Sequence, residues 1–195
     1  MYQPFLYLDM RLDWISLFRE CWILISRLAY SGVFALFLLA CIVWTHYYYP
    51  ESSALPRYDF LFIMAVLFQI LLLVTRLETL QEVAVIMVFH AMAMVMEWFK
   101  TLDTIGSWQY PGQFYLGIAQ VPLFVGFMYS AVGSALARGM RVFQMKLIHP
   151  PRLRWAVVLA LLIYINFFSH HYMMNLRWPL LVVAIALYRK TTVQC

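Results

Sequence analysis

Long runs of apolar residues, each ended by charged or turn-forming residues, dominate the chain. The first run covers 29–49 and ends at Pro50, and the second covers 58–75, between Arg57 and Arg76. Because ~20 consecutive apolar residues suffice for a helix to cross a bilayer, such runs predict transmembrane helices. We predict about six spans, at 29–49, 58–75, 79–98, 114–137, 155–168 and 173–188.

The two ends of the chain depart from this pattern. Only an eleven-residue apolar run follows Arg177, so the sixth element either includes a charged residue or is a buried or re-entrant segment. Near the amino terminus, charged residues are mixed with Leu, Trp and Phe, which is typical of an amphipathic helix in the membrane interface. We therefore divide the chain into an interfacial segment (1–28), a transmembrane helical bundle (29–188) and a short cytoplasmic tail (189–195).

Composition supports the membrane class. The 195-residue chain is 65% hydrophobic and 12% charged, whereas soluble domains are roughly 45–50% apolar and 25% charged. Aromatic residues make up 18% of the chain, and Trp and Tyr favour bilayer interfaces. The predicted fold class is an all-α, multi-pass transmembrane bundle with an N-terminal amphipathic interfacial helix.

The net charge of +5 is distributed unevenly among the predicted loops. With six spans, eleven of the 14 Lys and Arg residues fall on the side of the two termini, and the others are Arg57, Lys100 and Arg177. Basic residues collect on the cytoplasmic side of membrane proteins. We therefore expect a protein of the bacterial cytoplasmic (inner) membrane with both termini in the cytoplasm. The charge indicates membrane lipids as partners rather than nucleic acid, and the oligomeric state stays open.

Polar residues within the predicted spans are candidates for function, because ionisable groups are costly in a membrane. His90 and Glu97 lie on one stripe of the third span, with Glu97 near the outer rim and His90 about 10 Å deeper, so that only His90 is expected to be buried. We predict Glu97 and His90 as catalytic residues. The candidate substrate-binding residues are polar or aromatic side chains expected around them: Asp59, Gln69, Trp98, Trp108, Tyr110, Tyr129, Asn166 and His170.

A purely structural interpretation fits the same residues. A neutral His90 that forms a hydrogen bond across the bundle, and a Glu97 paired with Lys100 or Arg177, would give the same pattern.

Other polar residues predict packing and ion pairs rather than chemistry. Small residues at four-residue spacing predict close helix contact, at Gly126, Ser130 and Ser134. An ion-pair network is expected at the cytoplasmic end, among Arg76, Glu78, Glu82, Arg138 and Arg141.

No motif of a familiar catalytic class is present. The sequence contains no HExxH, Walker or GxSxG motif, which disfavours the corresponding metal, phosphate and nucleophile chemistries. Cys21, Cys41 and Cys195 are not spaced as zinc ligands or as a redox pair. We predict no metal site and no cofactor.

Eight segments that occur in order resemble one family. They are RYDFLF, LETLQE, FHAMAMVMEWFK, GSWQYP, VPLFVGFMYSAVGSALAR, HPP, YINFFSHH and NLRW. Together, from about Arg57 to Tyr188, they resemble a bacterial membrane-protein family known as domain of unknown function 817. The resemblance implies a helical protein of the cytoplasmic membrane and supplies no activity. Members of that family continue into further spans and a second acidic, tryptophan-containing segment, so it also implies a C-terminal truncation here.

Three functions stay open. In the first, the protein is a membrane-embedded enzyme in which Glu97 delivers a proton to a lipid or polyene, His90 orients or recycles the proton, and nearby aromatic rings stabilise the cation. An outer-end glutamate followed by a Gly, Trp and Tyr loop also resembles, more distantly, membrane hydratases and cyclases of carotenoid synthesis. In the second, the polar residues line the site of a membrane carrier or ligand-binding protein. The third is a truncated, non-functional remnant.

Overall fold

Helices account for most of the protein. The computed structural model describes residues 14–50 and 52–194, which form seven helices and four short strands. The helices are α1 (Trp14–Ser31), α2 (Val33–Tyr48), α3 (Arg57–Val74), α4 (Leu80–Thr101), α5 (Phe124–Val142), α6 (Leu153–Ser169) and α7 (Arg177–Tyr188). The predicted predominance of helix is confirmed.

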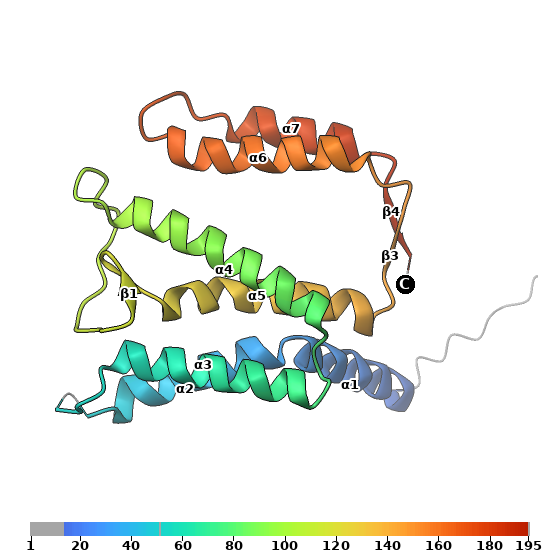
Figure 1. The fold of residues 1–195 in the computed structure, drawn as a ribbon. Helices are drawn as coiled ribbons and strands as arrows, with labels where there is room; N and C mark the ends of the chain where they lie inside the picture. Colours follow the sequence, from blue (N-terminus) through green and yellow to red (C-terminus); the bar gives the residue numbers. More distant parts are fainter. Residues whose placement is uncertain (1–13, 51, 195) are drawn as a thin grey trace, which may run out of the picture.

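The helices run back and forth, so that their connections gather at two ends of the molecule (Figure 1). We name these ends after the acidic residue that each contains. The Glu97 end comprises the α2–α3 connection, the loop 102–123 and the α6–α7 turn. The Glu78 end comprises the α3–α4 connection and segment 143–152, and α1 enters the bundle there.

Helices α4 and α5 pack closely in the middle of the bundle, because α5 presents small side chains to α4. Ser130 Oγ donates a hydrogen bond to the Ile86 carbonyl across this contact, 3.1 Å away. A methyl group on Gly126 would lie 2.5 Å from the His90 ring, and one on Gly133 would lie 2.9 Å from the Phe89 ring. The predicted packing role of the small residues of α5 is confirmed.

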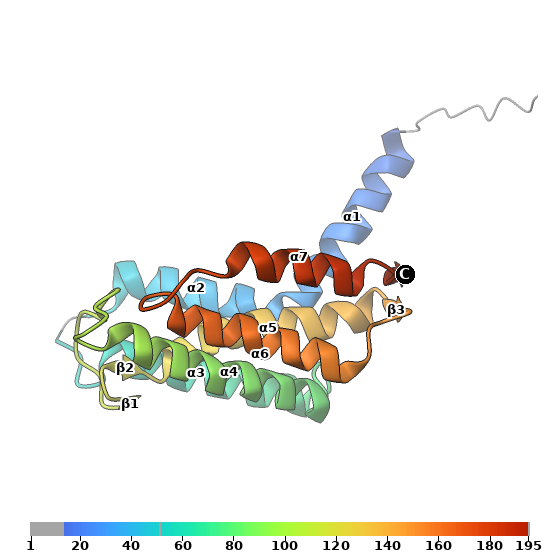
Figure 2. The same ribbon diagram turned by 90° about the horizontal axis from the view of Figure 1, so that it is seen from above.

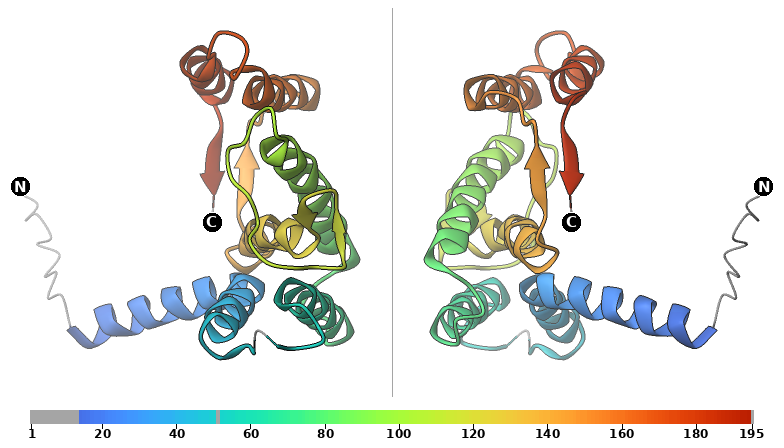
Figure 3. Two further views of the ribbon diagram at one scale, coloured as in Figure 1. Left: turned by 90° about the vertical axis from the view of Figure 1, so that its left-hand side faces the viewer. Right: turned by 90° about the vertical axis from the view of Figure 1, so that its right-hand side faces the viewer.

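An apolar core joins α2, α3 and α5. Phe34 lies at its centre, stacked on Phe68 and edge-on to Phe127. The pair α6 and α7 forms a separate layer beyond α4 (Figures 1 and 3). This layer contacts α4 through long side chains, among them Tyr164, whose hydroxyl donates to the Met92 carbonyl at 3.0 Å.

Two helices, α3 and α4, are long and apolar enough to cross a membrane. Helices α1 and α2 add a third candidate span if the pair, bent by 73°, is counted as one. The described residues thus provide two or three candidate spans by length and composition, and the predicted six are not supported. Helix α5 carries two arginines, and α6 and α7 are only 17 and 12 residues long.

Short strands replace parts of two predicted segments. Residues 117–118 (β1) and 121–122 (β2) form a hairpin, with the intervening Ala119 at a φ of 52°. Helix α5 therefore begins at Phe124 and not at 114. In the segment predicted as a tail, 192–194 (β4) pairs antiparallel with 146–148 (β3), with Lys146 opposite Gln194. The predicted all-α class agrees broadly with the structure, and these four short strands are its only departures among the described residues.

Helix α1 leaves the bundle at an angle (Figures 2 and 3). It ends at Ser31, three residues beyond the predicted boundary at 28, and the chain bends by 73° between α1 and α2. Most of its described side chains are exposed. Residues 1–13 of the predicted interfacial segment lie outside the described residues, and its interfacial location stays a prediction.

Candidate functional site

The carboxylate of Glu97 is enclosed by three neutral hydrogen-bond donors. Trp108 Nε1 and the Tyr110 hydroxyl donate to Oε2 at 2.8 Å and 2.5 Å, and the Tyr129 hydroxyl donates to Oε1 at 2.5 Å. We refer to these four residues as the Glu97 cluster. Glu97 is only 2% exposed. The expectation that it lies open at the rim, or is paired with a cation, is therefore wrong, because the loop after α4 folds back over it.

Asp59, at the start of α3, holds this loop in place. Its two carboxylate oxygens accept hydrogen bonds from the backbone N–H groups of Tyr115 and Leu116, at 2.7 Å and 2.9 Å. Tyr58, beside it, packs its ring edge-on against Tyr110, with the centroids 6.2 Å apart. Both oxygens of Asp59 are therefore engaged in anchoring the loop that carries Trp108 and Tyr110.

Tyr110 belongs to the loop and closes the cluster from outside the helices. Burial of its phenol, reinforced by the hydrogen bond to Glu97, raises the pKa of Tyr110 well above its usual range. Desolvation disfavours the phenolate, and the adjacent carboxylate disfavours it further. Tyr110 therefore stays protonated and continues to donate to Glu97 at alkaline pH.

His90 lies further along α4 and does not hydrogen-bond to Glu97, as its spacing predicted. Its ring packs edge-on against Phe127, with the centroids 4.8 Å apart, and rests on Gly126. The ring is half-buried. Its Nδ1 atom is buried without a hydrogen-bond partner among residues 14–50 and 52–194. His90 is thus less buried than Glu97, the reverse of the sequence expectation.

The other predicted substrate-binding residues are dispersed. Gln69 lies at the Glu78 end, where its amide donates to Glu78. Trp98 is 46% exposed on α4. Asn166 and His170 line a separate cavity between α6 and α7. The structure brings together Glu97, Trp108, Tyr110 and Tyr129 and places the rest elsewhere.

The Glu78 end holds a different kind of buried acid. Glu78 forms an ion pair with Arg138, whose side chain is completely buried, and accepts hydrogen bonds from Gln69 and, at 2.6 Å, from Ser134. Arg138 also donates to the Tyr30 carbonyl at 3.2 Å. Nearby, Glu82 pairs with Arg141 at 3.0 Å and forms a capping box with Thr79 at the start of α4. The expected pairing of these glutamates with arginines of α5 is confirmed.

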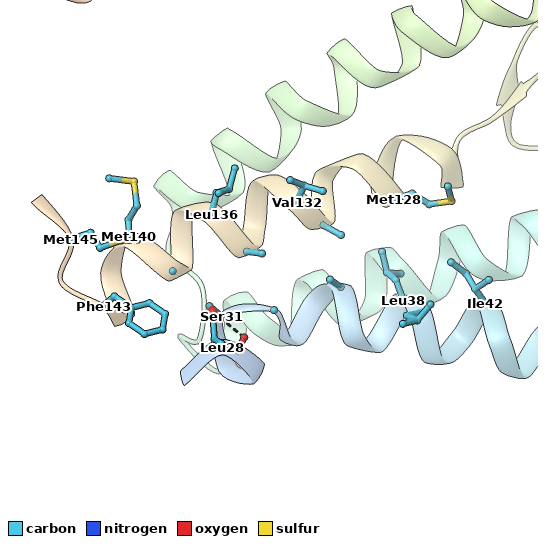
Figure 4. Close-up of a pocket in the computed structure, with 16 residues that line it drawn as sticks. Leu28, Ser31, Leu38, Ile42, Met128, Val132, Leu136, Met140, Phe143 and Met145 are labelled. Atoms are coloured by element: carbon cyan, nitrogen blue, oxygen red, sulfur yellow. Dashed lines mark hydrogen bonds between the residues drawn. The ribbon is translucent and has the colours of Figure 1, made fainter. Parts of the chain in front are cut away.

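Two cavities of the structure differ in the polar side chains that line them. One cavity, of about 850 Å³, lies between α5 and the α1–α2 pair (Figure 4). Its lining is apolar except for Ser31, whose hydroxyl is already bonded to the Leu28 carbonyl of its own helix, at 2.9 Å. A cavity of about 410 Å³ at the Glu97 end is bounded by Tyr110, Asp103 and Phe114. The smaller cavity therefore borders the cluster, whereas the larger one offers only apolar contacts.

Metal-ligand geometry is not found in the part of the chain that the structure describes, because no three His, Cys, Asp or Glu side chains come together there. Local sequence patterns gave no signal for the role of Asp59 in anchoring the loop, because its backbone partner lies 56 residues away. They also gave none for the contact between Lys100 and His171.

Comparison with known proteins places the chain in a family without assigning it an activity. The family model described as "Protein of unknown function (DUF817)" matches residues 20–195. The chain is 41% identical over 139 residues to the uncharacterized protein YoaT of Bacillus subtilis (strain 168). That match covers 71% of this chain and 52% of YoaT, so the chain spans about half the length of this relative. No solved structure matches the chain. The chain belongs to the DUF817 family, as its sequence segments implied.

Proposed function

We propose that this chain belongs to a multi-pass protein of the bacterial cytoplasmic membrane whose Glu97 cluster transfers protons to an apolar, unsaturated substrate such as a lipid or polyene. One observation carries the proposal. Glu97 is a buried acid whose three hydrogen-bond partners are all neutral. A change in its charge therefore breaks no ion pair.

Membrane insertion beyond α3 and α4 is supported by the burial of Arg138 in α5. Arg138 lowers the hydropathy of that helix, but its side chain is fully buried and paired with Glu78. Charged groups inside membranes are tolerated where they face the bundle interior and pair with one another. Helix α5 can therefore cross as well. Helix α7, about 18 Å long at 1.5 Å per residue, covers only part of a ~30 Å hydrocarbon core.

The orientation follows from the positive charge at the Glu78 end. Arg76 and segment 143–152 lie there, whereas the long loop 102–123 lies at the opposite end. Placing the basic end in the cytoplasm puts β4 and the α1–α2 bend there, puts the Glu97 cluster near the outer surface, and agrees with the cytoplasmic location that we expect for both termini.

The chemistry begins at the cavity that Tyr110 borders. A substrate that displaces the Tyr110 hydroxyl gains access to Oε2 of Glu97. The protonated carboxyl adds its proton to one carbon of a double bond, and the adjacent carbon becomes a cation, which the ring faces of Trp108 and Tyr110 stabilise. Loss of a different proton from the cation to the Glu97 carboxylate yields an isomer, and addition of water to the cation, with one proton of that water passing to the carboxylate, yields a hydrate. His90, two turns along the helix, provides a second position for a proton.

The test is a one-atom change at the acid. Cells expressing the chain, its Glu97→Gln variant or no insert are compared by untargeted profiling of membrane lipids. The proposal expects a product in the parent cells that is absent from the other two. Glu20→Gln is the matched control, because it makes the same change to an exposed glutamate of α1 that lies outside the Glu97 cluster and its cavity. A Glu97→Gln profile identical to that of the parent would rule the proton transfer out.

A second function, a membrane carrier, is favoured by buried polar atoms without partners. Within the described residues these are Gln69 Oε1, His90 Nδ1 and Arg138 Nε, on three adjacent helices. Polar groups of this kind mark pathways through membrane proteins. Reconstituted vesicles that take up a solute equally well with His90→Phe and Gln69→Leu would exclude a passage along these atoms.

The topology is tested by cysteine labelling in a variant without native cysteines. A cysteine at Ser107 should react with a membrane-impermeant maleimide in intact cells. A cysteine at Gln144 should react only after the membrane is permeabilised. Labelling of both positions from the same side would contradict the orientation and the outer location of the Glu97 cluster.

A further inference from the structure

A cavity of about 530 Å³ lies where the end of α4 meets α6 and α7. Its walls are formed mostly by apolar side chains of the two later helices, among them Phe167, Leu181 and Ala184. Two basic residues, Lys100 and Arg177, line the same cavity. The site therefore combines a long apolar surface with a positively charged part.

No acid among the described residues neutralises either basic residue. Lys100 is largely buried, with its Nζ atom 2.5 Å from His171 Nε2 and 4.5 Å from the centre of the Phe167 ring. Arg177 is exposed at the first turn of α7. Within 14–50 and 52–194, neither side chain takes part in an ion pair. The two cations thus leave a surplus of positive charge at one end of the cavity.

The acids nearest in sequence do not remove this surplus. Glu97 lies one turn before Lys100 but forms no ion pair with it in the described residues, and both carboxylate oxygens of Glu97 already accept hydrogen bonds from the Glu97 cluster. Asp103 lines the separate cavity beside Tyr110. An anion brought by a ligand would therefore meet cations without displacing an existing partner.

The two histidines of the α6–α7 turn leave the positive charge of Lys100 in place. Nδ1 of His170 lies 2.7 Å from the Phe167 carbonyl and donates to it, which leaves Nε2 of this ring without a proton in the neutral form. Partial desolvation and the positive charge of Lys100 lower the pKa of His171. A neutral His171 accepts a hydrogen bond from the Lys100 ammonium and holds it at the cavity.

We propose that this cavity binds an anionic phospholipid, with its phosphate between Lys100 and Arg177 and one acyl chain along α6 and α7. Arginine binds phosphate oxygens through two parallel N–H groups, and lysine adds a point charge. Ala184 lies seven residues beyond Arg177, about 10 Å along the helix, so the apolar wall extends well past the cations. The site is independent of the Glu97 chemistry, because it uses other side chains and a different cavity.

The test uses the purified full chain in neutral detergent and native mass spectrometry. Phosphatidylglycerol, phosphatidylcholine with the same acyl chains, and inorganic phosphate are the three probes. Phosphatidylglycerol should bind more tightly than phosphatidylcholine. Arg177→Gln should weaken phosphatidylglycerol binding about fivefold, as expected for the loss of one basic residue, and should weaken phosphatidylcholine less, because its choline group offsets the phosphate charge. Arg189→Gln, at the other end of α7, is the matched control and should change neither.

The apolar part of the site has its own variant. Ala184→Phe places a ring in the cavity and should weaken both lipids, with their ratio preserved. Equal binding of the two lipids, or equal effects of Arg177→Gln and Arg189→Gln, would overturn the proposal. So would inorganic phosphate that competes with phosphatidylglycerol at equal concentration, because the acyl chain would then contribute nothing. Arg177 is exposed, so its substitution leaves the helix packing intact.

Discussion

Two buried glutamates, one near each end of α4, are held in opposite ways. Glu78 faces a fully buried arginine and two polar side chains. Glu97 faces two phenols and an indole, and no cation bonds to it in the described residues. The two acids are equally buried, at 2% exposed. Burial alone therefore does not distinguish a structural acid from a reactive one.

The two glutamates differ in the groups that bind their carboxylates. A proton added to Glu78 would leave Arg138 buried and uncompensated, which is costly, so the ion pair fixes the charge of that end. A proton added to Glu97 disturbs only hydrogen bonds, and a tyrosine hydroxyl can rotate to accept as well as to donate. The comparison assigns stability to the Glu78 end and chemistry to the Glu97 end.

Breaking the ion pair should have the largest effect. Arg138→Met leaves the Glu78 charge buried without a cation, and loss of one member of a buried pair costs about 3–5 kcal/mol. The free energy of unfolding in detergent measures this change. The double variant Glu78→Gln with Arg138→Met removes both charges and should regain most of the loss. A double variant as unstable as Arg138→Met would show that packing of the arginine, and not its charge, holds this end.

Single hydrogen bonds to the two acids provide a matched pair of smaller changes. Tyr129→Phe and Ser134→Ala each remove one donor to a buried carboxylate and should each cost about 1.5–3 kcal/mol in unfolding free energy. Their effects on the lipid product should differ. Tyr129→Phe is expected to reduce product formation, and Ser134→Ala to leave product per folded protein unchanged. Equal losses of product from both variants would remove the distinction between the two ends.

The packing of α4 against α5 lies between the two acids. A substitution at Gly126 tests how tight this packing is. Gly126→Ala places a methyl group 2.5 Å from the His90 ring, and overpacking of this kind costs about 1–3 kcal/mol. His90→Ala in the same chain should relieve the clash. A Gly126→Ala variant with unchanged unfolding free energy would show that α4 and α5 separate easily.

The smallest expected effect is a pH dependence confined to alkaline solution. The pKa of Tyr110 is raised in the folded protein, whereas an unfolded tyrosine ionises near about pH 10. Its contribution to stability is therefore complete below about pH 10 and is lost as the pH rises through the folded pKa. Above about pH 10, unfolding free energy should decline less steeply for Tyr110→Phe than for the parent. Parallel declines would contradict the assigned burial of this phenol.

Sequence reasoning located the Glu97 cluster in part. Trp108 and Tyr110 are predicted near Glu97 because they follow it in the loop, and Tyr129 because it is a polar side chain within the fourth predicted span. The structure places all three on the Glu97 carboxylate. The enclosure itself was not predictable, since it depends on the Asp59 carboxylate holding a loop more than 50 residues away in the sequence. Local periodicity carries no record of such a contact.

The predicted spans show a second feature that the sequence alone does not determine. Apolar runs predicted α3 and α4 to within a few residues. The predicted start of α5 is wrong because residues 117–122, which were assigned to a span, form a hairpin. From the sequence, Arg138 is predicted to lie in a loop. It is buried because the α3–α4 connection brings the Glu78 carboxylate to it. Tertiary partners decided these features.

The most direct test compares the two acids in one experiment. Lipid profiles and unfolding free energies are measured for the parent, for Glu97→Gln and for the double variant Glu78→Gln with Arg138→Met. We predict that Glu97→Gln folds but makes no product, and that the double variant folds and makes product. A double variant that folds yet loses the product together with Glu97→Gln, or a Glu97→Gln variant that retains it, would contradict the assignment of chemistry to the Glu97 end.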